Sequence, residues 1–195
     1  MYEVEMKLRA DHDPLRQRLT AMDADHIGGV TQTDTYYDAP DRDFAETDEA
    51  FRVRRETDHP KDGRDLDHTD ATAGDKRVLL TYKGPLVDDT SKTREEAETR
   101  VAEEAELEAI LAGLGYEPAA TVHKNRDRYE VGGCRVTLDR VDEVGEFVEV
   151  EHHDPVAETE IEGAREAVTD LLVELDLNPG ESIQTSYLGL VLAGR

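Results

Sequence analysis

Two segments of the chain alternate acidic and apolar side chains. At the start, Glu3 and Glu5 flank one valine and are followed at the same spacing by Lys7; later in the chain, Glu149 and Glu151 flank another valine. In a β-strand successive side chains point to opposite faces, so the charged members of each segment share one face. A cluster of carboxylates suits Mg²⁺ or Mn²⁺, which prefer oxygen ligands.

Basic side chains show the same spacing in two other segments, Arg52 with Arg54 and Lys124 with Arg126. A cluster of arginine and lysine side chains suits the oxygens of a polyphosphate. Burying many charges is costly unless they are paired or coordinate a ligand, so faces of opposite sign are expected to meet. Together the acidic and basic faces predict a site for a metal-bound triphosphate.

A closed antiparallel β-barrel is the simple architecture that brings such faces together. Its lumen would be lined by carboxylates and cations, and its apolar outer faces would be covered by helices. We therefore expect an α+β protein, a closed antiparallel eight-stranded barrel that forms a tunnel, with helices packed outside.

Several sequence blocks occur in the order found in one known family, from about residue 3 to residue 151. The chain resembles CYTH-domain proteins, the triphosphate tunnel group that contains class IV adenylate cyclases and thiamine or inorganic triphosphatases. The blocks are Glu3-x-Glu5-x-Lys7, Asp34-Thr35-Tyr36-Tyr37-Asp38, Phe51-Arg52-Val53-Arg54, Leu80-Thr81-Tyr82-Lys83-Gly84-Pro85, Thr93-Arg94-Glu95-Glu96, Lys124-x-Arg126, Leu138-Asp139 and Gly145-Glu146-Phe147-Val148-Glu149-Val150-Glu151.

The resemblance implies a role for each charged position. It assigns metal binding (Mg²⁺ or Mn²⁺) to the carboxylates, catalysis to four cations and substrate binding to three more. The metal set is Glu3, Glu5, Asp139, Glu149 and Glu151; the catalytic set is Lys7, Arg52, Arg54 and Lys83; the substrate-binding set is Arg94, Lys124 and Arg126. Glu96 and Glu98 share the parity of Arg94 and are expected to hold basic groups in place. The alternative is that these cations are surface ion pairs, since the chain has 47 acidic residues.

The form of the blocks is closest to the class IV adenylate cyclases, phosphorus–oxygen lyases that convert ATP to cyclic AMP and pyrophosphate. A tripolyphosphatase or thiamine triphosphatase, in which water attacks the terminal phosphorus, is the first alternative. The segment after Ser186-Tyr187 lacks the lysine associated with the thiamine triphosphatase branch. A non-catalytic binder of triphosphate or polyphosphate is the second alternative, but such a protein would not need the full set of carboxylates.

Composition narrows the class of protein. The 195 residues carry a net charge of −24, which makes nucleic-acid binding electrostatically unfavourable. Six lysines stand against seventeen arginines on this acid-rich chain, a composition that suits a halophilic source; the alternative is an acidic mesophilic protein. Cys134 is the single cysteine, which fits a reducing cytoplasm.

No apolar run is long enough to span a membrane, and the first strand leaves no room for a signal peptide. We therefore expect a cytoplasmic protein without a membrane partner. The cyclase branch implies a homodimer.

One domain covering residues 1–195 is expected, with a solvated acidic loop at 58–75. Strands are predicted at 2–9, at a segment ending with 35–37, around 52–54, and at 78–83, 121–131, 135–141 and 146–152; a further strand at 91–101 depends partly on the resemblance. Helices are predicted at 14–22, 103–114 and 162–175, with a turn or short helix at 40–47, a tight turn at Gly132-Gly133 and a final apolar segment at 183–192.

Overall fold

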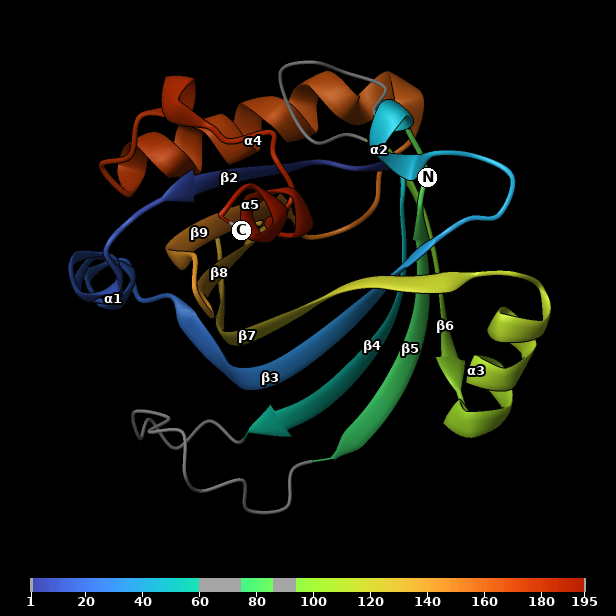
Figure 1. Ribbon diagram of the computed structural model, residues 1–195. Helices are drawn as coiled ribbons and strands as arrows, with labels where there is room; N and C mark the ends of the chain where they lie inside the picture. Colours follow the sequence, from blue (N-terminus) through green and yellow to red (C-terminus); the bar gives the residue numbers. More distant parts are fainter. Residues whose placement is uncertain (1, 60–74, 86–93, 195) are drawn as a thin grey trace.

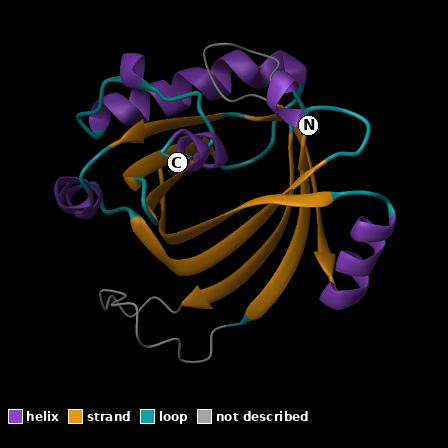
Figure 2. Cartoon of the chain, viewed as in Figure 1, coloured by secondary structure: helices purple, strands orange, loops and turns teal. Residues whose placement is uncertain are grey.

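The structure, a computed structural model, describes residues 2–59, 75–85 and 94–194, with the side chain of Ala45 left undescribed. Its strands form one antiparallel sheet (Figures 1 and 2). The strands are β1 (Tyr2–Glu3), β2 (Glu5–Arg9), β3 (Asp25–Asp38), β4 (Ala50–His59), β5 (Lys76–Lys83), β6 (Arg94–Val101), β7 (Glu117–Val131), β8 (Cys134–Val141) and β9 (Gly145–His152).

The first segment of the chain brings the two edges of the sheet together. The strand order is β1-β6-β5-β4-β3-β7-β8-β9-β2, so β1 and β2 stand at opposite edges although only Val4 separates them. The result is a nearly closed barrel, as predicted, but with nine strands instead of eight. The predicted first strand divides at Val4, whose side chain is buried outside the barrel against Val156 and Ala164 while its backbone changes from one neighbouring strand to the other.

Helices α1 (His12–Ala21) and α4 (Ile161–Glu174) cover the outer faces of β2, β8 and β9. The predicted i, i+4 pair of α1, Leu15 and Leu19, is buried in this core, which fixes the helix on the barrel. Burying each leucine side chain contributes about 1.5–3 kcal/mol relative to exposure. The other buried members are Met6, Leu8, Cys134, Val136, Leu138, Val148, Val150, Val168, Leu171, Leu172 and Leu175.

Two further helices cover other parts of the barrel. Helix α3 (Glu104–Gly113) places Leu111 against Tyr37 and Val53 on the outer face of β3 and β4. Helix α5 (Tyr187–Ala193) instead packs on Phe147 and other apolar residues at one end of the lumen, and it closes that end. A short helix, α2 (Phe44–Thr47), precedes β4.

Most predicted boundaries hold to within a few residues, and the tight turn at Gly132-Gly133 is confirmed, with φ values of +59° and +75°. Helix α1 begins two residues earlier than predicted. Strand β4 extends to His59, into the predicted loop at 58–75, because Asp58 N donates to Asp75 O at 3.2 Å. Residues 60–74 of that loop, and residues 91–93 of the predicted strand at 91–101, lie outside the described residues. No helix in the described parts of the chain is long and apolar enough to cross a membrane.

Candidate active site

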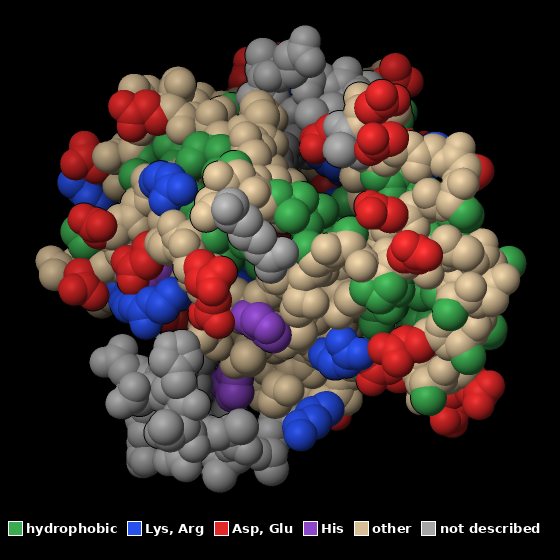
Figure 3. Space-filling view, viewed as in Figure 1, with side chains coloured by type: hydrophobic (Ala, Val, Ile, Leu, Met, Phe, Trp, Pro, Cys, Tyr) green, Lys and Arg blue, Asp and Glu red, His purple; other side chains and the backbone are tan. Residues whose placement is uncertain are grey.

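The barrel lumen contains a cavity of about 240 Å³ lined mostly by charged side chains. Strand alternation carries the charged positions inward and leaves the apolar positions for the outer core. Every site residue predicted from the sequence lines this cavity except Asp139: Glu3, Glu5, Lys7, Arg52, Arg54, Lys83, Arg94, Lys124, Arg126, Glu149 and Glu151. On the face shown in Figure 3, Asp and Glu side chains are spread widely over the outside, with Lys and Arg side chains between them, in keeping with the net charge of −24.

One wall of the cavity is cationic and is organised around Asp34. Arg54 donates from Nε to Asp34 Oδ1 at 2.6 Å and from Nη2 to Oδ2 at 2.8 Å. Arg52 and Lys124 approach the same carboxylate at 3.5 and 3.6 Å. Burial alone would raise the pKa of the fully buried Asp34, but the three cations hold it well below its usual range. One carboxylate thus faces three cations, and the wall keeps a surplus of positive charge.

Two features indicate that the excess positive charge of this wall can bind an anion. Among the described residues, Arg52 Nε is a buried donor with no hydrogen-bond partner. Burial, together with repulsion by Arg126 and Arg54, lowers the pKa of Lys124 to about 7. A negatively charged ligand in the cavity would relieve both conditions, because it would accept from the donor and favour the charged lysine.

We predict that Asp34→Asn lowers the free energy of unfolding by about 3 kcal/mol, because it leaves buried cations without their shared carboxylate. Asp38→Asn, at an exposed position of the same strand, is the matched control and should change stability little. Urea unfolding followed by circular dichroism measures both. Equal effects of the two substitutions would show that the Asp34 contacts do not stabilise the cationic wall.

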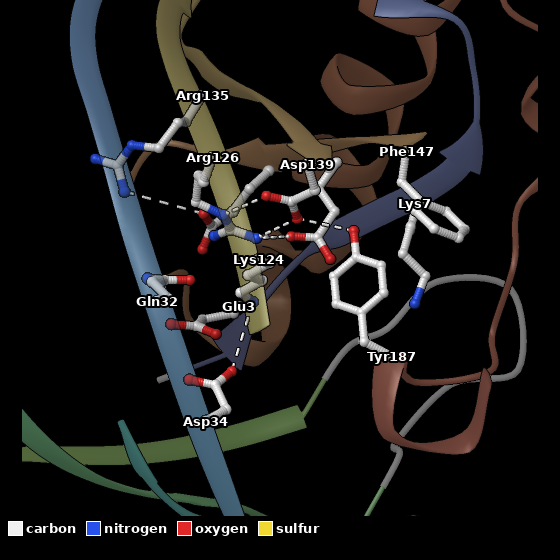
Figure 4. A network of polar contacts seen from close by, with 12 residues as sticks. Glu3, Lys7, Gln32, Asp34, Lys124, Arg126, Arg135, Asp139, Phe147 and Tyr187 are labelled. Atoms are coloured by element: carbon white, nitrogen blue, oxygen red, sulfur yellow. Dashed lines mark hydrogen bonds and ion pairs between the residues drawn. The ribbon is translucent and has the colours of Figure 1, made fainter. Parts of the chain in front are cut away.

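A second group of contacts joins Arg126 to two carboxylates. Arg126 Nε donates to Asp139 Oδ1 at 2.7 Å, and Nη2 donates to Asp139 Oδ2 at 2.6 Å and to Glu149 Oε2 at 2.5 Å. The Tyr187 hydroxyl donates to Asp139 Oδ2 at 2.8 Å (Figure 4). Asp139 is fully buried behind Arg126, whereas the other four carboxylates of the predicted metal set line the cavity.

The opposite side of the cavity is acidic. Lys83 forms ion pairs with Glu96 and, at 3.5 Å, with Glu3. Burial and a hydrogen bond shared with Glu96 raise the pKa of Glu3 to about 8. Burial and repulsion by Glu5 raise the pKa of Glu151 to about 7. These carboxyls therefore resist carrying their full negative charge in the arrangement described.

The acidic side fits a hard divalent cation. A divalent cation would favour the charged forms of Glu3 and Glu151, whose pKa values are raised by burial and by neighbouring carboxyls, and oxygen-rich clusters are the usual ligands of Mg²⁺ and Mn²⁺. Within the described ranges, no three Asp, Glu, His or Cys side chains already converge at metal-binding distance. Because Mg²⁺ usually keeps several waters, Glu3, Glu5, Glu149 and Glu151 could hold it with few direct ligands.

Glu96, Glu98 and Arg94 have the following contacts. Glu96 pairs with a basic group, as expected, and that group is Lys83. Glu98 instead accepts a hydrogen bond from the Thr81 hydroxyl at 2.9 Å. Arg94 donates to the backbone oxygen of Asp48 at 2.6 Å and to its side chain at 2.7 Å.

Sequence reasoning missed the parts played by Asp34 and Tyr187. The sequence allows Asp34 a role in orienting the strand end or metal-bound water, but it gives no sign that this carboxylate holds three cations. Asp34 shares strand parity with Tyr36, which lines the cavity, so its side chain lies on the inner face of β3. No sequence signal marked Tyr187, since its position depends on how α5 crosses the end of the barrel.

A nearly closed antiparallel barrel with cations on one side of its lumen and carboxylates on the other is the architecture of a triphosphate tunnel. The CYTH domain matches residues 1–187, and the chain belongs to this family. CYTH proteins are metal-dependent enzymes that act on triphosphates.

Individual relatives cover nearly the whole chain. A protein of Methanocaldococcus jannaschii that bears the name "Putative adenylate cyclase" is 30% identical over 192 residues, 97% of this chain and 98% of that protein. A solved structure from Pyrococcus horikoshii is 33% identical, covers 99% of each chain and superposes with a TM-score of 0.84. A structure from Hippeastrum, described as having a dominant triphosphatase activity, is 19% identical with a TM-score of 0.62, covers 99% of this chain and 96% of its own, and shows a similar fold.

Proposed function

We propose that the chain binds a metal–triphosphate complex in the barrel lumen and is a class IV adenylate cyclase that forms cyclic AMP and pyrophosphate from ATP. The observation that carries this proposal is the separation of charge within one cavity. Arg52, Arg54 and Lys124 share one carboxylate on one side. On the other side Lys83 pairs with Glu96 and Glu3, and the pKa values of Glu3 and Glu151 are raised. A triphosphate and its divalent cation together supply the two charges that these sides lack.

The cations of this chain would bind and align the phosphates. Arg54 is held at a fixed position by Asp34, and Arg126 is held by Asp139, so little reorganisation is needed when the phosphate charge arrives. In phosphoryl transfer, positioning and charge stabilisation supply most of the catalysis. Glu3, Glu5, Glu149 and Glu151 would hold Mg²⁺ or Mn²⁺, which when bound neutralises phosphate charge and polarises the phosphorus.

In the cyclase reaction the 3′-hydroxyl of ATP attacks the α-phosphorus and gives up its proton to solvent, the bond from this phosphorus to the bridging oxygen breaks, and pyrophosphate leaves. The DTYYD and LTYKGP blocks and the likeness to the Methanocaldococcus relative support this assignment. A triphosphatase, in which water attacks the terminal phosphorus, is the second candidate. The activity described for the Hippeastrum protein favours it, because the same fold there serves hydrolysis.

The products identify the reaction. ATP, tripolyphosphate and thiamine triphosphate are offered separately, with Mg²⁺ or Mn²⁺ in high KCl, and followed by ³¹P NMR. Cyclic AMP with pyrophosphate from ATP is the expected result. Orthophosphate without cyclic AMP would replace the cyclase with a triphosphatase. Binding without turnover of any of the three would replace the enzyme with a binding protein.

Lys124 gives the proposal a pH signature. Because its pKa is lowered to about 7 in the free protein, Lys124 is largely neutral above pH 7, and phosphate charge beside it would raise the pKa again. Binding of tripolyphosphate without metal is therefore expected to take up a proton at pH 8 and to weaken as the pH rises from 7 to 9.

Calorimetric titrations in buffers of different ionisation enthalpy measure this uptake. In Lys124→Arg the side chain stays charged throughout, so the uptake at pH 8 should fall by up to one proton. Glu3, whose pKa is raised to about 8, also titrates in this range, but it is present in both proteins, so the difference between them reports mainly the titration of Lys124. Equal proton uptake by the wild type and by Lys124→Arg would show that Lys124 does not face the bound phosphates.

A further inference from the structure

Tyr187 stands where the C-terminal segment meets the lumen. It is the first residue of α5, directly after Ser186, whose hydroxyl oxygen accepts from Gly189 N at 3.0 Å and fixes the start of the helix. The tyrosine side chain is buried, with 5% of its surface exposed, and it lines the cavity. Its ring packs edge-on against Phe147, with the ring centroids 5.1 Å apart.

The hydroxyl of Tyr187 belongs to the hydrogen-bond network that orients Arg126. It donates to Asp139 Oδ2, the same oxygen that accepts from Arg126 Nη2. Asp139 thus has one carboxylate oxygen fixed from both sides, and Arg126 in turn reaches Glu149 in the cavity wall. Because hydrogen bonds to charged groups are strong and directional, removal of this donor is expected to loosen the orientation of the Asp139–Arg126 pair.

The ring of Tyr187 faces two of the cavity lysines. Lys7 Nζ lies 4.2 Å and Lys124 Nζ lies 5.1 Å from the ring centroid, distances at which a cation is attracted to the face of an aromatic ring. Figure 4 shows the side chain of Lys7 beside Tyr187. Lys7 Nζ also donates to the backbone oxygen of Thr185 at 2.5 Å, so the same C-terminal segment holds this lysine twice. Lys7 is only 1% exposed, and its ammonium group has few other positions to occupy.

We propose that Tyr187 is a positioning residue for the triphosphate reaction, its hydroxyl orienting Arg126 through Asp139 and its ring placing Lys7 and Lys124 toward the phosphates. This inference rests on the proposed function. A tyrosine that only filled the end of the barrel would need neither a hydroxyl directed at a buried carboxylate nor two ammonium groups over its ring. Packing alone would be served equally well by phenylalanine.

Two substitutions separate the hydroxyl from the ring. Tyr187→Phe keeps the ring and is expected to lower kcat/KM about tenfold, the loss of one hydrogen bond to a charged group. In an Asp139→Asn background the same substitution should change kcat/KM less than about twofold, because the group through which the hydroxyl acts has already been altered. Tyr187→Leu removes the ring as well and should also weaken metal-free binding of tripolyphosphate about tenfold.

Tyr116→Phe is the matched control, since Tyr116 packs outside the barrel near α3 and should leave both quantities unchanged. Thermal unfolding verifies that each variant is folded.

If the wild type turns over a triphosphate while Tyr187→Phe and Tyr187→Leu match it in kcat/KM and in tripolyphosphate binding, the positioning role is wrong. An undiminished effect of Tyr187→Phe in the Asp139→Asn background would also overturn it. If the wild type neither binds nor turns over any triphosphate, the proposed function itself fails and the positioning role fails with it.

Discussion

Arg52→Ala is expected to lower kcat/KM for the preferred triphosphate about a thousandfold, the size of effect seen when a charge-stabilising donor of a phosphoryl-transfer site is removed. Arg52 is the cavity arginine best suited to this test. Its closest approach to Asp34 is 3.5 Å, and its buried Nε lacks a hydrogen-bond partner in the described parts of the chain, so its binding capacity is still available for phosphate.

The same substitution should leave the fold intact. Arg54 continues to neutralise Asp34 through two hydrogen bonds, so Arg52→Ala does not leave a buried carboxylate unpaired. Arg55→Ala is the matched control: Arg55 lies on the same strand as Arg52, three residues further along, but pairs with Glu104 and Glu108 outside the barrel. Steady-state kinetics on the three proteins decide the matter. Comparable activity of Arg52→Ala and Arg55→Ala would place the reaction outside the lumen.

Glu5→Gln should have an effect of similar size for a different reason. The substitution keeps the shape of the side chain but removes a charge from the carboxylates that we propose bind the metal, and activity is expected to fall about a thousandfold because charge neutralisation by the metal supplies several kcal/mol. Raising the Mg²⁺ concentration should restore part of the activity, since the loss arises from weakened metal binding.

Stability should change little. Glu5 repels Glu151 but also attracts Lys83, so its neutral replacement removes an unfavourable and a favourable interaction together. The free energy of unfolding of Glu5→Gln is therefore expected to stay close to that of the wild type. Glu95→Gln, at an exposed position of β6, is the control and should preserve turnover. Full turnover by Glu5→Gln at low Mg²⁺ would contradict the metal role of Glu5.

The alternation of side chains along each strand was enough to predict most of the residues that line the lumen. In a barrel every strand has one face inside, so the alternation of Glu3, Glu5 and Lys7 fixed their common direction once the opposite face was apolar. The same reasoning applied to Arg52 and Arg54. Parity carries no information about which charges meet across strands, and for that reason the lumen could be predicted but not its ion pairs.

Register supplies the missing information, and it could be derived for one pair only. A two-residue turn at Gly132-Gly133 pairs Val131 with Cys134 and, five residues further along each strand, Arg126 with Asp139. The pairing of Asp34 with Arg54 has no such basis, because the connection between β3 and β4 is long and includes α2. The position of Tyr187 depends on the path of the chain between α4 and α5, which no local pattern determines.

A crystal structure of the protein with tripolyphosphate and Mn²⁺, in which anomalous scattering locates the metal, tests directly whether the lumen binds a metal–triphosphate complex. We expect phosphate density in the lumen against Arg52, Arg54 and Lys124, and an anomalous peak among Glu3, Glu5, Glu149 and Glu151. Tripolyphosphate bound on the outer surface, or a metal bound away from these carboxylates, would contradict this expectation.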